Sequence, residues 1–220
     1  EQDRPDYLAI SFDVGRTFRH DLYPEYKATR EKMPSDLQQQ MARLRELAAA
    51  FCIPVFTREG YEADDVLGST AVWAAKQGLG VKIITGDRDL LQLVNDRTIV
   101  YLAGDDKNFI TPEDVLGKLH VRPDQVVDYK AIVGDQSDNI PGVPGVGEKT
   151  TERLISKYGT LDNIYAHLDE IEPRWRAKLE AGKASAYMSY QLAAIRTDLT
   201  VAIDLEQARI EVFEPAKVEK

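Results

Sequence analysis

Several residue types that define common kinds of site are scarce in this chain of 220 residues. The single cysteine, Cys52, excludes an internal disulfide and fits a reducing compartment. Because Phe51 and Ile53 flank it, we expect a buried and unreactive thiol. Only three histidines are present, and none stands near a cysteine or serine in a pattern typical of nucleophilic catalysis.

Long apolar runs are also lacking. No stretch approaches the roughly 20 residues that a membrane helix needs, and the first residues have no signal-peptide character. The composition, 43% hydrophobic and 30% charged, is typical of a globular protein. We therefore expect a cytoplasmic protein without a membrane partner.

Negative charge is abundant, with 37 acidic residues against 28 basic ones and a net charge of −9. Such an excess argues at first against a nucleic-acid partner, because phosphate binding relies on Lys and Arg. Eight of the acidic residues are clustered, however, and without them the chain is almost neutral. Between Arg16 and Arg45 basic residues outnumber acidic ones. A locally positive stretch therefore follows the first of the acidic groups.

The clustered carboxylates occur where one predicted element gives way to the next. They are Asp13; Glu62, Asp64 and Asp65; Asp87 and Asp89; and Asp135 with Asp138. Two unit charges ~4 Å apart repel by roughly 4 kcal/mol at an effective dielectric of 20, so a gathered set would need divalent cations. Carboxylate sites without His or Cys favour Mg²⁺ or Mn²⁺.

Three of the four acidic groups also have an ordinary interpretation. Acids in the first turn of a helix are favoured by the helix dipole, which accounts for one or two of the residues at 62–65. Asp87 is a plausible helix N-cap, and Asp135 and Asp138 are common turn residues. These alternatives remain open at the level of the sequence.

Strands and helices alternate in the first half of the chain. Strands are predicted over 7–12, 53–56, 81–85 and 98–101, and helices over 35–51, 63–77 and 88–94. Residues 16–33 show no period, so we expect an irregular segment. The alternation predicts an α/β fold with a parallel sheet. Asp13 and Asp87 then lie just past the carboxyl ends of their strands, where ligands bind in such sheets.

The helix predicted over 35–51 begins with Ser35 as a plausible N-cap. Its apolar residues recur at helical spacing, which indicates a stripe facing the core. The members of this stripe are Leu37, Met41, Leu44, Leu47 and Ala48.

The second half is predicted to be mostly helical, with helices after Thr111 and over 123–133, and a strand only at 201–203. We therefore expect an α/β core over residues 1–110, a helical subdomain over 111–205 and a charged tail over 206–220.

A glycine-rich segment runs from Gly142 to Thr150. It does not fit a P-loop, because Glu148 separates the last glycine from Lys149 and no buried strand precedes it. What remains is a turn at Gly145 and Gly147 whose backbone N–H groups could contact phosphate at a helix start. Simple packing between helices is the alternative.

Aromatic and cationic residues are mixed in the segment that contains Tyr23, Tyr26 and Lys27, with Arg19 and Arg30 on either side. This combination grips single-stranded or frayed nucleic acid by stacking and charge. The alternative is a solvated surface loop.

These motifs together resemble the 5′-nuclease domain of bacterial DNA polymerase I, in the flap endonuclease superfamily. The similarity extends from the first strand to about Leu199. The motifs occur in the family's order: Phe12-Asp13, Phe18-Arg19-His20, Tyr26-Lys27-Ala28, Gly60-Tyr61-Glu62-Ala63-Asp64-Asp65, Thr85-Gly86-Asp87-Arg88-Asp89 and Gly134-Asp135-Gln136-Ser137-Asp138-Asn139. The segment from Gly142 to Thr151 resembles the family's helix–turn–helix variant.

The resemblance implies a PIN-like nuclease core followed by a helical H3TH subdomain that binds DNA. It also implies two divalent ions for phosphodiester hydrolysis. The first metal group would be Asp13, Glu62, Asp64 and Asp65. Asp87 and Asp89 would bridge toward the second, which Asp135 and Asp138 complete.

The resemblance further implies roles in binding DNA. Arg19 and Lys27 would neutralise the scissile phosphate, with Tyr26 near the strand end and Arg30 in the arch. The turn with Gly142, Gly145, Gly147, Lys149 and Thr150 would hold downstream duplex, with K⁺ bound at the turn. The expected substrate is a 5′ flap or a nicked or branched duplex, cut during replication and repair, with a polymerase domain in the full-length protein.

One departure from the family concerns an earlier strand that ends in an Asp-Gly pair and supplies another metal ligand. The sequence begins after that region, so we expect weak or absent nuclease activity for the chain alone. A second hypothesis is therefore a catalytically impaired fragment that binds duplex DNA. A third is a ribonuclease with a similar acidic metal site.

Overall fold

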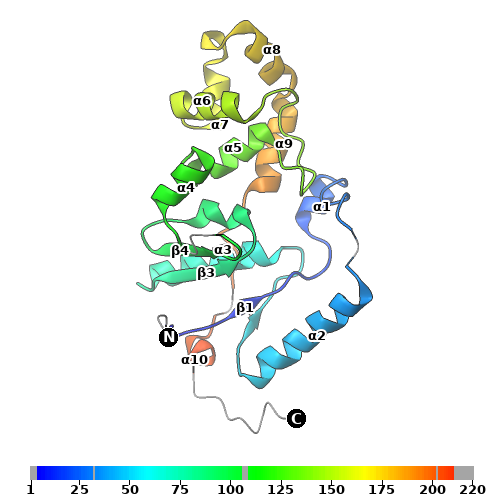
Figure 1. Ribbon diagram of the computed structural model, residues 1–220, viewed down its shortest axis with the longest axis vertical. Helices are drawn as coiled ribbons and strands as arrows, with labels where there is room; N and C mark the ends of the chain where they lie inside the picture. Colours follow the sequence, from blue (N-terminus) through cyan, green and yellow to red (C-terminus); the bar gives the residue numbers. More distant parts are fainter. Residues whose placement is uncertain (1–3, 32, 106–108, 202, 211–220) are drawn as a thin grey trace. The chain divides into compact units, whose positions relative to one another are not determined.

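The computed structural model describes residues 4–31, 33–105, 109–201 and 203–210, and these form two compact units. The first unit comprises Glu1–Thr17, Glu31–Thr70 and Arg196–Lys220, as far as these ranges are described. The second comprises Phe18–Arg30 and Ala71–Ile195. Both units therefore draw on segments that are distant in sequence (Figure 1).

The first unit contains a short parallel pair of strands, β1 (Ile10–Ser11) and β2 (Val55–Phe56). Ser11 pairs with Phe56, and the Ser11 hydroxyl donates to the Phe56 carbonyl at 2.9 Å. The other elements of this unit are α2 (Ser35–Ala50), the start of α3 (Ala63–Lys76) and α10 (Leu205–Ala208). The strands predicted over 7–12 and 53–56 are thus present but shorter.

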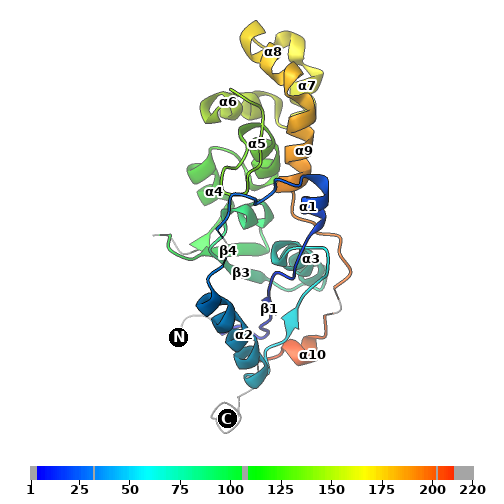
Figure 2. The same cartoon turned by 90° about the vertical axis from the view of Figure 1, so that its right-hand side faces the viewer.

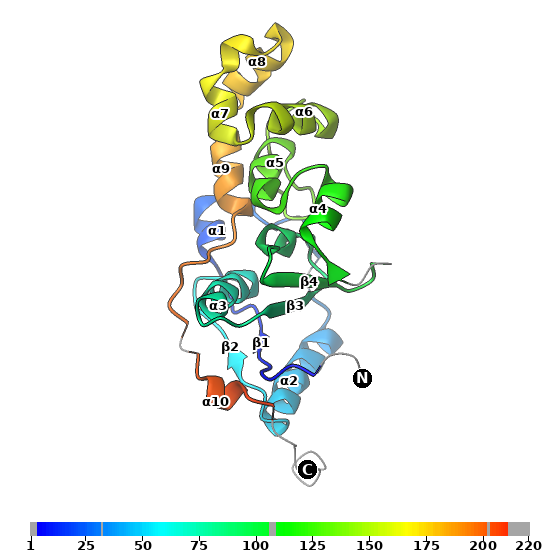
Figure 3. The same ribbon diagram turned by 90° about the vertical axis from the view of Figure 1, so that its left-hand side faces the viewer.

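The second unit contains a three-stranded sheet in the order β3-β4-β5. Strands β3 (Val81–Thr85) and β4 (Thr98–Leu102) are parallel and lie side by side (Figure 3), whereas β5 (Phe109–Ile110) is antiparallel to β4. Alternate residues of β4 are buried, as a strand with one face on a core requires.

The second unit also contains α-helices and short 3-10 helices, which carry the label η. They are α1 (Phe18–Leu22), η1 (Arg88–Leu93), α4 (Pro112–Leu119), η2 (Pro123–Gln125), α5 (Val126–Val133), α6 (Glu148–Tyr158), α7 (Leu161–Ala166), η3 (Leu168–Glu170), α8 (Pro173–Ala181) and α9 (Lys183–Ala193). Helix α5 packs along α9 (Figure 1), and α6 and α7 contact α5 (Figure 2). One cluster beside these helices joins Tyr26, Ile140, Leu192 and Ala193.

Two glycines close the loop that follows α5. Gly134 and Gly142 both have positive φ, and a Cβ on Gly134 would lie 2.5 Å from the Ile140 carbonyl oxygen. Between them, Asp135 and Ile140 exchange two backbone hydrogen bonds of 2.8 and 2.7 Å. Only glycine allows both the φ values and this close approach of backbone to backbone. The loop that carries Asp135 and Asp138 is therefore tightly fixed.

Several expectations drawn from the sequence are wrong. Cys52 is exposed, because it occupies a left-handed turn just after α2 with φ of 57°. Of the stripe predicted to face a core, Leu37, Leu44 and Leu47 are exposed, whereas Ala48 is buried. Ser35 is the first helical residue of α2, and Pro34 takes the N-cap position.

Two further segments differ from the prediction. Residues 16–33 are not irregular throughout, since α1 forms over Phe18–Leu22. Val201 and Ile203 are not in a strand, and Ala202, like the tail from residue 211, lies outside the described residues. In the described ranges, no helix has the length and apolarity needed to cross a membrane.

Candidate metal and nucleic-acid site

The first acidic group gathers at the start of α3, in the first unit. Asp13 follows β1, and its Oδ1 accepts a hydrogen bond from the Ala63 backbone N–H at 2.7 Å. Asp65 is fully buried, and its two oxygens accept from the backbone N–H groups of Glu62 and Arg196, both at 2.9 Å. Glu62 is also buried, whereas Asp64 is half-buried. The structure therefore brings β1 and the first turn of α3 together around these carboxylates.

The hydrogen bonds of Asp65 support both interpretations of this group. A carboxylate that accepts backbone N–H groups at a helix start is stabilised by the helix dipole, without any metal. The helix dipole alone does not account for two buried carboxyl groups, those of Glu62 and Asp65, only three residues apart.

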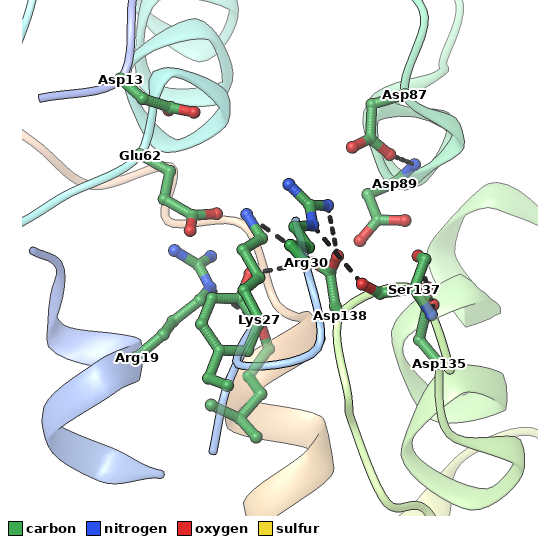
Figure 4. Close-up of polar contacts among 12 residues, drawn as sticks. Asp13, Arg19, Lys27, Arg30, Glu62, Asp87, Asp89, Asp135, Ser137 and Asp138 are labelled. Carbon is green, nitrogen blue, oxygen red and sulfur yellow. Dashed lines mark hydrogen bonds and ion pairs between the residues drawn. The ribbon is translucent and has the colours of Figure 1, made fainter. Parts of the chain in front are cut away.

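In the second unit, Asp87 and Asp89 follow β3. The Asp87 side chain accepts from the Asp89 backbone N–H at 2.8 Å and so caps η1 (Figure 4). The predicted N-cap role of Asp87 is therefore present. Asp89, two residues further on, extends toward α5, where it forms an ion pair with Lys130.

Lys130 links the two acidic groups of the second unit. Its ammonium pairs with Asp89 Oδ1 and lies 2.7 Å from Asp135 Oδ2. The other oxygen of Asp135 accepts from the backbone N–H and hydroxyl of Ser137, at 2.8 and 2.7 Å. Lys130 was not among the residues predicted from the sequence. The available signal was a lysine inside the mostly apolar helix α5, five residues before Asp135.

The environment of these groups separates their pKa values. Burial raises the pKa of Asp89 to about 6 against the opposing effect of Lys130, and the charge of Asp87 adds to the rise. Burial also disfavours the Asp135 carboxylate, but the hydrogen bonds from Lys130 and Ser137 outweigh it and lower its pKa to about 2. Burial alone would lower the pKa of Lys130, yet Asp89 and Asp135 raise it. The ammonium and the Asp135 carboxylate therefore stay charged at neutral pH.

Asp138 contacts three of the residues predicted to bind DNA (Figure 4). Its Oδ2 accepts from the Tyr26 hydroxyl at 3.0 Å and lies 3.7 Å from the Lys27 ammonium, and its Oδ1 pairs with Arg30. The Lys27 backbone N–H also donates to the Asp138 carbonyl at 2.9 Å. A predicted metal ligand and predicted DNA contacts thus share one cluster.

Arg19, on α1, contacts the end of α9 in the second unit and lies beside Lys27 (Figure 4). It is buried, and its guanidinium donates to the carbonyls of Leu192 and Ala194 at the end of α9, both at 2.8 Å. These bonds fix the position of α1 against α9. Arg19 therefore has a structural role in addition to the one predicted for it.

The glycine turn precedes α6. Gly145 and Gly147 are exposed, and Gly147 is the N-cap residue of α6. Lys178 of α8 donates to the Gly145 carbonyl at 2.8 Å. Of the other residues predicted for this turn, Lys149 is exposed, whereas Gly142 and Thr150 are buried. Only the exposed members can contact a phosphate directly.

The donor set fits hard divalent cations, because every candidate ligand is a carboxylate. Among the described residues, no three His, Cys, Asp or Glu side chains form a group arranged to hold a metal ion. Asp89 and Asp135 nevertheless already share a cationic group, the ammonium of Lys130. This pair is therefore oriented toward a common positive charge.

Family models match both halves of this chain. Residues 1–120 match the N-terminal resolvase-like domain of 5′-3′ exonuclease, and residues 121–216 match its C-terminal SAM fold. DNA polymerase I of Caldicellulosiruptor bescii is 48% identical over 215 residues, which cover 95% of this chain and 25% of the relative. DNA polymerase I of Bacillus subtilis is 40% identical over 223 residues, covering 99% and 25%.

A solved structure is also similar. A T5 protein co-crystallised with metal ions has a TM-score of 0.72 and 25% identity, covering 86% of this chain and 74% of that chain. The chain spans about a quarter of the length of the curated relatives it matches. The predicted fold class, an α/β nuclease core with a helical subdomain, is confirmed, as is the resemblance on which it rested. The chain belongs to the 5′-3′ exonuclease family.

Proposed function

We propose that this chain is a structure-dependent 5′ nuclease that hydrolyses DNA phosphodiesters at 5′ flaps and at nicked or branched duplex. The observation that carries the proposal is the placement of the family's acidic motifs directly after β1 and β3 and in the loop closed by Gly134 and Gly142. A similar chain, the flap endonuclease of bacteriophage T5, was crystallised as a pseudo-enzyme–product complex with DNA and metal ions.

Replication and repair would be the setting of this activity. The curated relatives are DNA polymerase I proteins of which this chain spans about a quarter. We therefore propose that the longer protein joins this nuclease to a polymerase domain and that it acts in the cytoplasm.

Two groups of side chains would hold two Mg²⁺ or Mn²⁺ ions. The first group is Asp13, Glu62, Asp64 and Asp65, and the second is Asp87, Asp89, Asp135 and Asp138. When bound, such ions supply Lewis acidity and neutralise charge that develops during phosphodiester cleavage. Asp135 is preorganised for this role, since Ser137 fixes one carboxylate oxygen and leaves the other directed toward Lys130 and Asp89.

The cationic side chains would bind the DNA backbone. Lys27 and Arg30 form ion pairs with Asp138 in this structure. With DNA bound, each would pair with a phosphate instead, because a phosphate is a better partner for a partly exposed guanidinium or ammonium group. Arg19 would add its charge from α1, and Tyr26 would orient the strand end. The turn at Gly145 and Gly147 would hold downstream duplex, with K⁺ at its carbonyls.

A second candidate is a duplex-binding protein with impaired catalysis. It is favoured by the contacts of Asp138, whose two oxygens are engaged by Tyr26, Lys27 and Arg30. If these contacts persist with DNA present, Asp138 cannot serve as a metal ligand. The glycine turn would still be able to bind duplex DNA.

Replacing Asp87 by Asn separates the two candidates. We expect Asp87→Asn to abolish Mg²⁺-dependent cutting of an end-labelled 5′-flap DNA, because one ligand charge is lost, and to leave flap binding in Ca²⁺ unchanged or tighter. Asp169→Asn, at an exposed residue paired with Arg176, is the matched control and should cut like the wild type.

The same assay addresses the other outcomes. Equal cutting by Asp87→Asn and the wild type would contradict the proposed site. Binding without any wild-type cutting would support the impaired fragment, and faster cutting of an RNA flap than a DNA flap would support a ribonuclease.

A further inference from the structure

Lys130 occupies a position that the proposed function does not explain. It lies on α5, in an otherwise mostly apolar stretch, and its side chain is only 14% exposed. Its two partners are comparably shielded, with 16% exposure for Asp89 and 18% for Asp135. A lysine is seldom this buried unless its charge is compensated. The two carboxylates supply that compensation.

The contacts of Asp135 determine which of its atoms is available to a ligand. Ser137 holds Oδ1 through two hydrogen bonds, whereas Oδ2, among the residues that the structure describes, accepts only from the Lys130 ammonium. A cation bound by Asp135 would therefore use the same oxygen that Lys130 uses. The same competition applies at Asp89, where Oδ1 pairs with Lys130.

The local charge favours replacement of the ammonium by a doubly charged ion. Asp87, Asp89 and Asp135 carry three carboxylates against the ammonium of Lys130 and the guanidinium of Arg30, which interacts with Asp87 but is paired with Asp138. Negative charge is therefore in excess when all of these groups are ionised. A divalent cation neutralises more of the charge than an ammonium does.

Lysine is suited to leave such a site. Its charge is carried on a flexible four-carbon stem, so the ammonium can swing aside without movement of α5. We propose that Lys130 is a resident counter-ion: it holds Asp89 and Asp135 together in the metal-free protein, is displaced when they bind a divalent cation, and thereby sets the affinity for that cation. This inference rests on the proposed function and adds to it a residue that controls metal loading.

Measurement of Mg²⁺ affinity tests the inference without any assay of cutting. By isothermal titration calorimetry, we expect Lys130→Met to bind Mg²⁺ with a dissociation constant about tenfold lower than the wild type, because a like charge beside the ion is removed. Lys130→Arg keeps the charge and is the matched control, with an affinity no higher than that of the wild type. Unchanged or weaker binding by Lys130→Met would overturn the inference.

Thermal unfolding gives a second readout. Without metal, Lys130→Met should unfold at a lower temperature than the wild type, because two carboxylates lose their counter-ion. Saturating Mg²⁺ should reduce this difference in unfolding temperature between the two proteins. A difference of equal size with and without Mg²⁺ would show a merely structural role and would contradict the inference.

Chemical labelling of the wild type tests the inference without requiring that a variant folds. An amine-reactive reagent followed by mass spectrometry should label Lys130 slowly without metal and several-fold faster with Mg²⁺. Lys118 is an internal reference, because it pairs with Asp105 at 2.8 Å outside the candidate site and should not respond. Equal Lys130 labelling with and without Mg²⁺ would overturn the inference.

The two proposals fail in different ways. A wild-type chain that binds no Mg²⁺ would overturn the metal site of the proposed function together with this inference. Wild-type binding that depends on Asp87 but not on Lys130 would overturn the inference alone.

Discussion

Individual carboxylates in this protein serve the fold and the candidate site at the same time. Asp65 accepts two backbone N–H groups while fully buried, and Asp138 accepts a tyrosine hydroxyl and two cations. These contacts compensate charges that would otherwise repel in the absence of metal. A substitution at either residue should therefore change stability as well as any metal binding.

Asp128 is an acidic residue whose contacts indicate a purely structural role. It is buried, and its Oδ1 accepts from the Leu161 backbone N–H at 2.7 Å, at the start of α7. We expect Asp128→Ala to reduce the free energy of unfolding by about 1–3 kcal/mol at neutral pH, because a buried N–H loses its partner. Asp128→Asn keeps the oxygen and should retain most of the stability. Urea denaturation of both variants measures the difference.

The pH dependence of stability in the wild type and in Asp128→Asn is a further part of this prediction. Burial raises the pKa of Asp128, so the folded protein holds this proton more tightly than the unfolded chain. The wild type should lose stability as the pH rises from the ordinary carboxyl pKa through the raised one. Asp128→Asn should lack that loss, and parallel pH profiles for the two proteins would contradict the prediction.

At the scale of residues, the sequence indicated candidate ligands but not how they pair. The eight clustered carboxylates were selected because they recur at the ends of predicted elements, and their role as metal ligands stays a prediction. Lys130 could not be assigned, since its partner Asp89 is 41 residues away and the pairing depends on how η1 and α5 pack. Cys52 was misjudged because its neighbours are apolar, whereas its left-handed backbone turns it outward.

Among the elements, the loop between α5 and α6 is tightly constrained. A Cβ on Gly134 would lie 2.5 Å from the Ile140 carbonyl oxygen, and φ is +81°. We expect Gly134→Ala to lower the free energy of unfolding by more than about 2 kcal/mol, since both backbone strain and a steric clash arise. Gly159, with φ of +84° and open space around its Cβ position, is the matched control.

Gly159→Ala should cost only the strain of a left-handed alanine, about 1–2 kcal/mol. Chemical denaturation of the two variants checks the difference between them. Equal losses at the two glycines would show that the close approach of Gly134 to Ile140 contributes nothing.

Element types could be predicted well where local patterns decide them. Strand β3 and helix α3 begin at the predicted residues, because apolar runs and helix-start residues mark them. Helix α2 was predicted as a helix, but of its apolar stripe only Ala48 is buried, whereas Leu37, Leu44 and Leu47 are exposed. Periodicity identifies an apolar face and cannot identify what, if anything, covers it.

For the molecule as a whole, the net charge of −9 makes DNA binding dependent on local positive charge. Lys149 is exposed at the first turn of α6, directly after the glycine turn. If it contacts a phosphate, Lys149→Ala should weaken duplex binding for all sequences and reduce the slope of log affinity against log salt by about 1. Fluorescence anisotropy over a range of salt concentrations measures this slope.

Lys157 at the other end of α6 is the control, because it pairs with Glu170 and lies away from the glycine turn. Lys157→Ala should leave the slope unchanged. Equal effects of the two variants would indicate nonspecific attraction rather than a contact at the turn.

The central claim is that carboxylates from separate parts of the chain hold the divalent ions of a nuclease. An anomalous difference map from crystals grown with Mn²⁺ tests it most directly, because Mn²⁺ scatters anomalously and prefers carboxylate oxygens. We predict one peak within coordination distance of Asp89 and Asp135, with the Lys130 ammonium moved away, and another beside Glu62 and Asp65. Crystals at millimolar Mn²⁺ with no peak at either group, and Lys130 still bridging its two aspartates, would contradict the account.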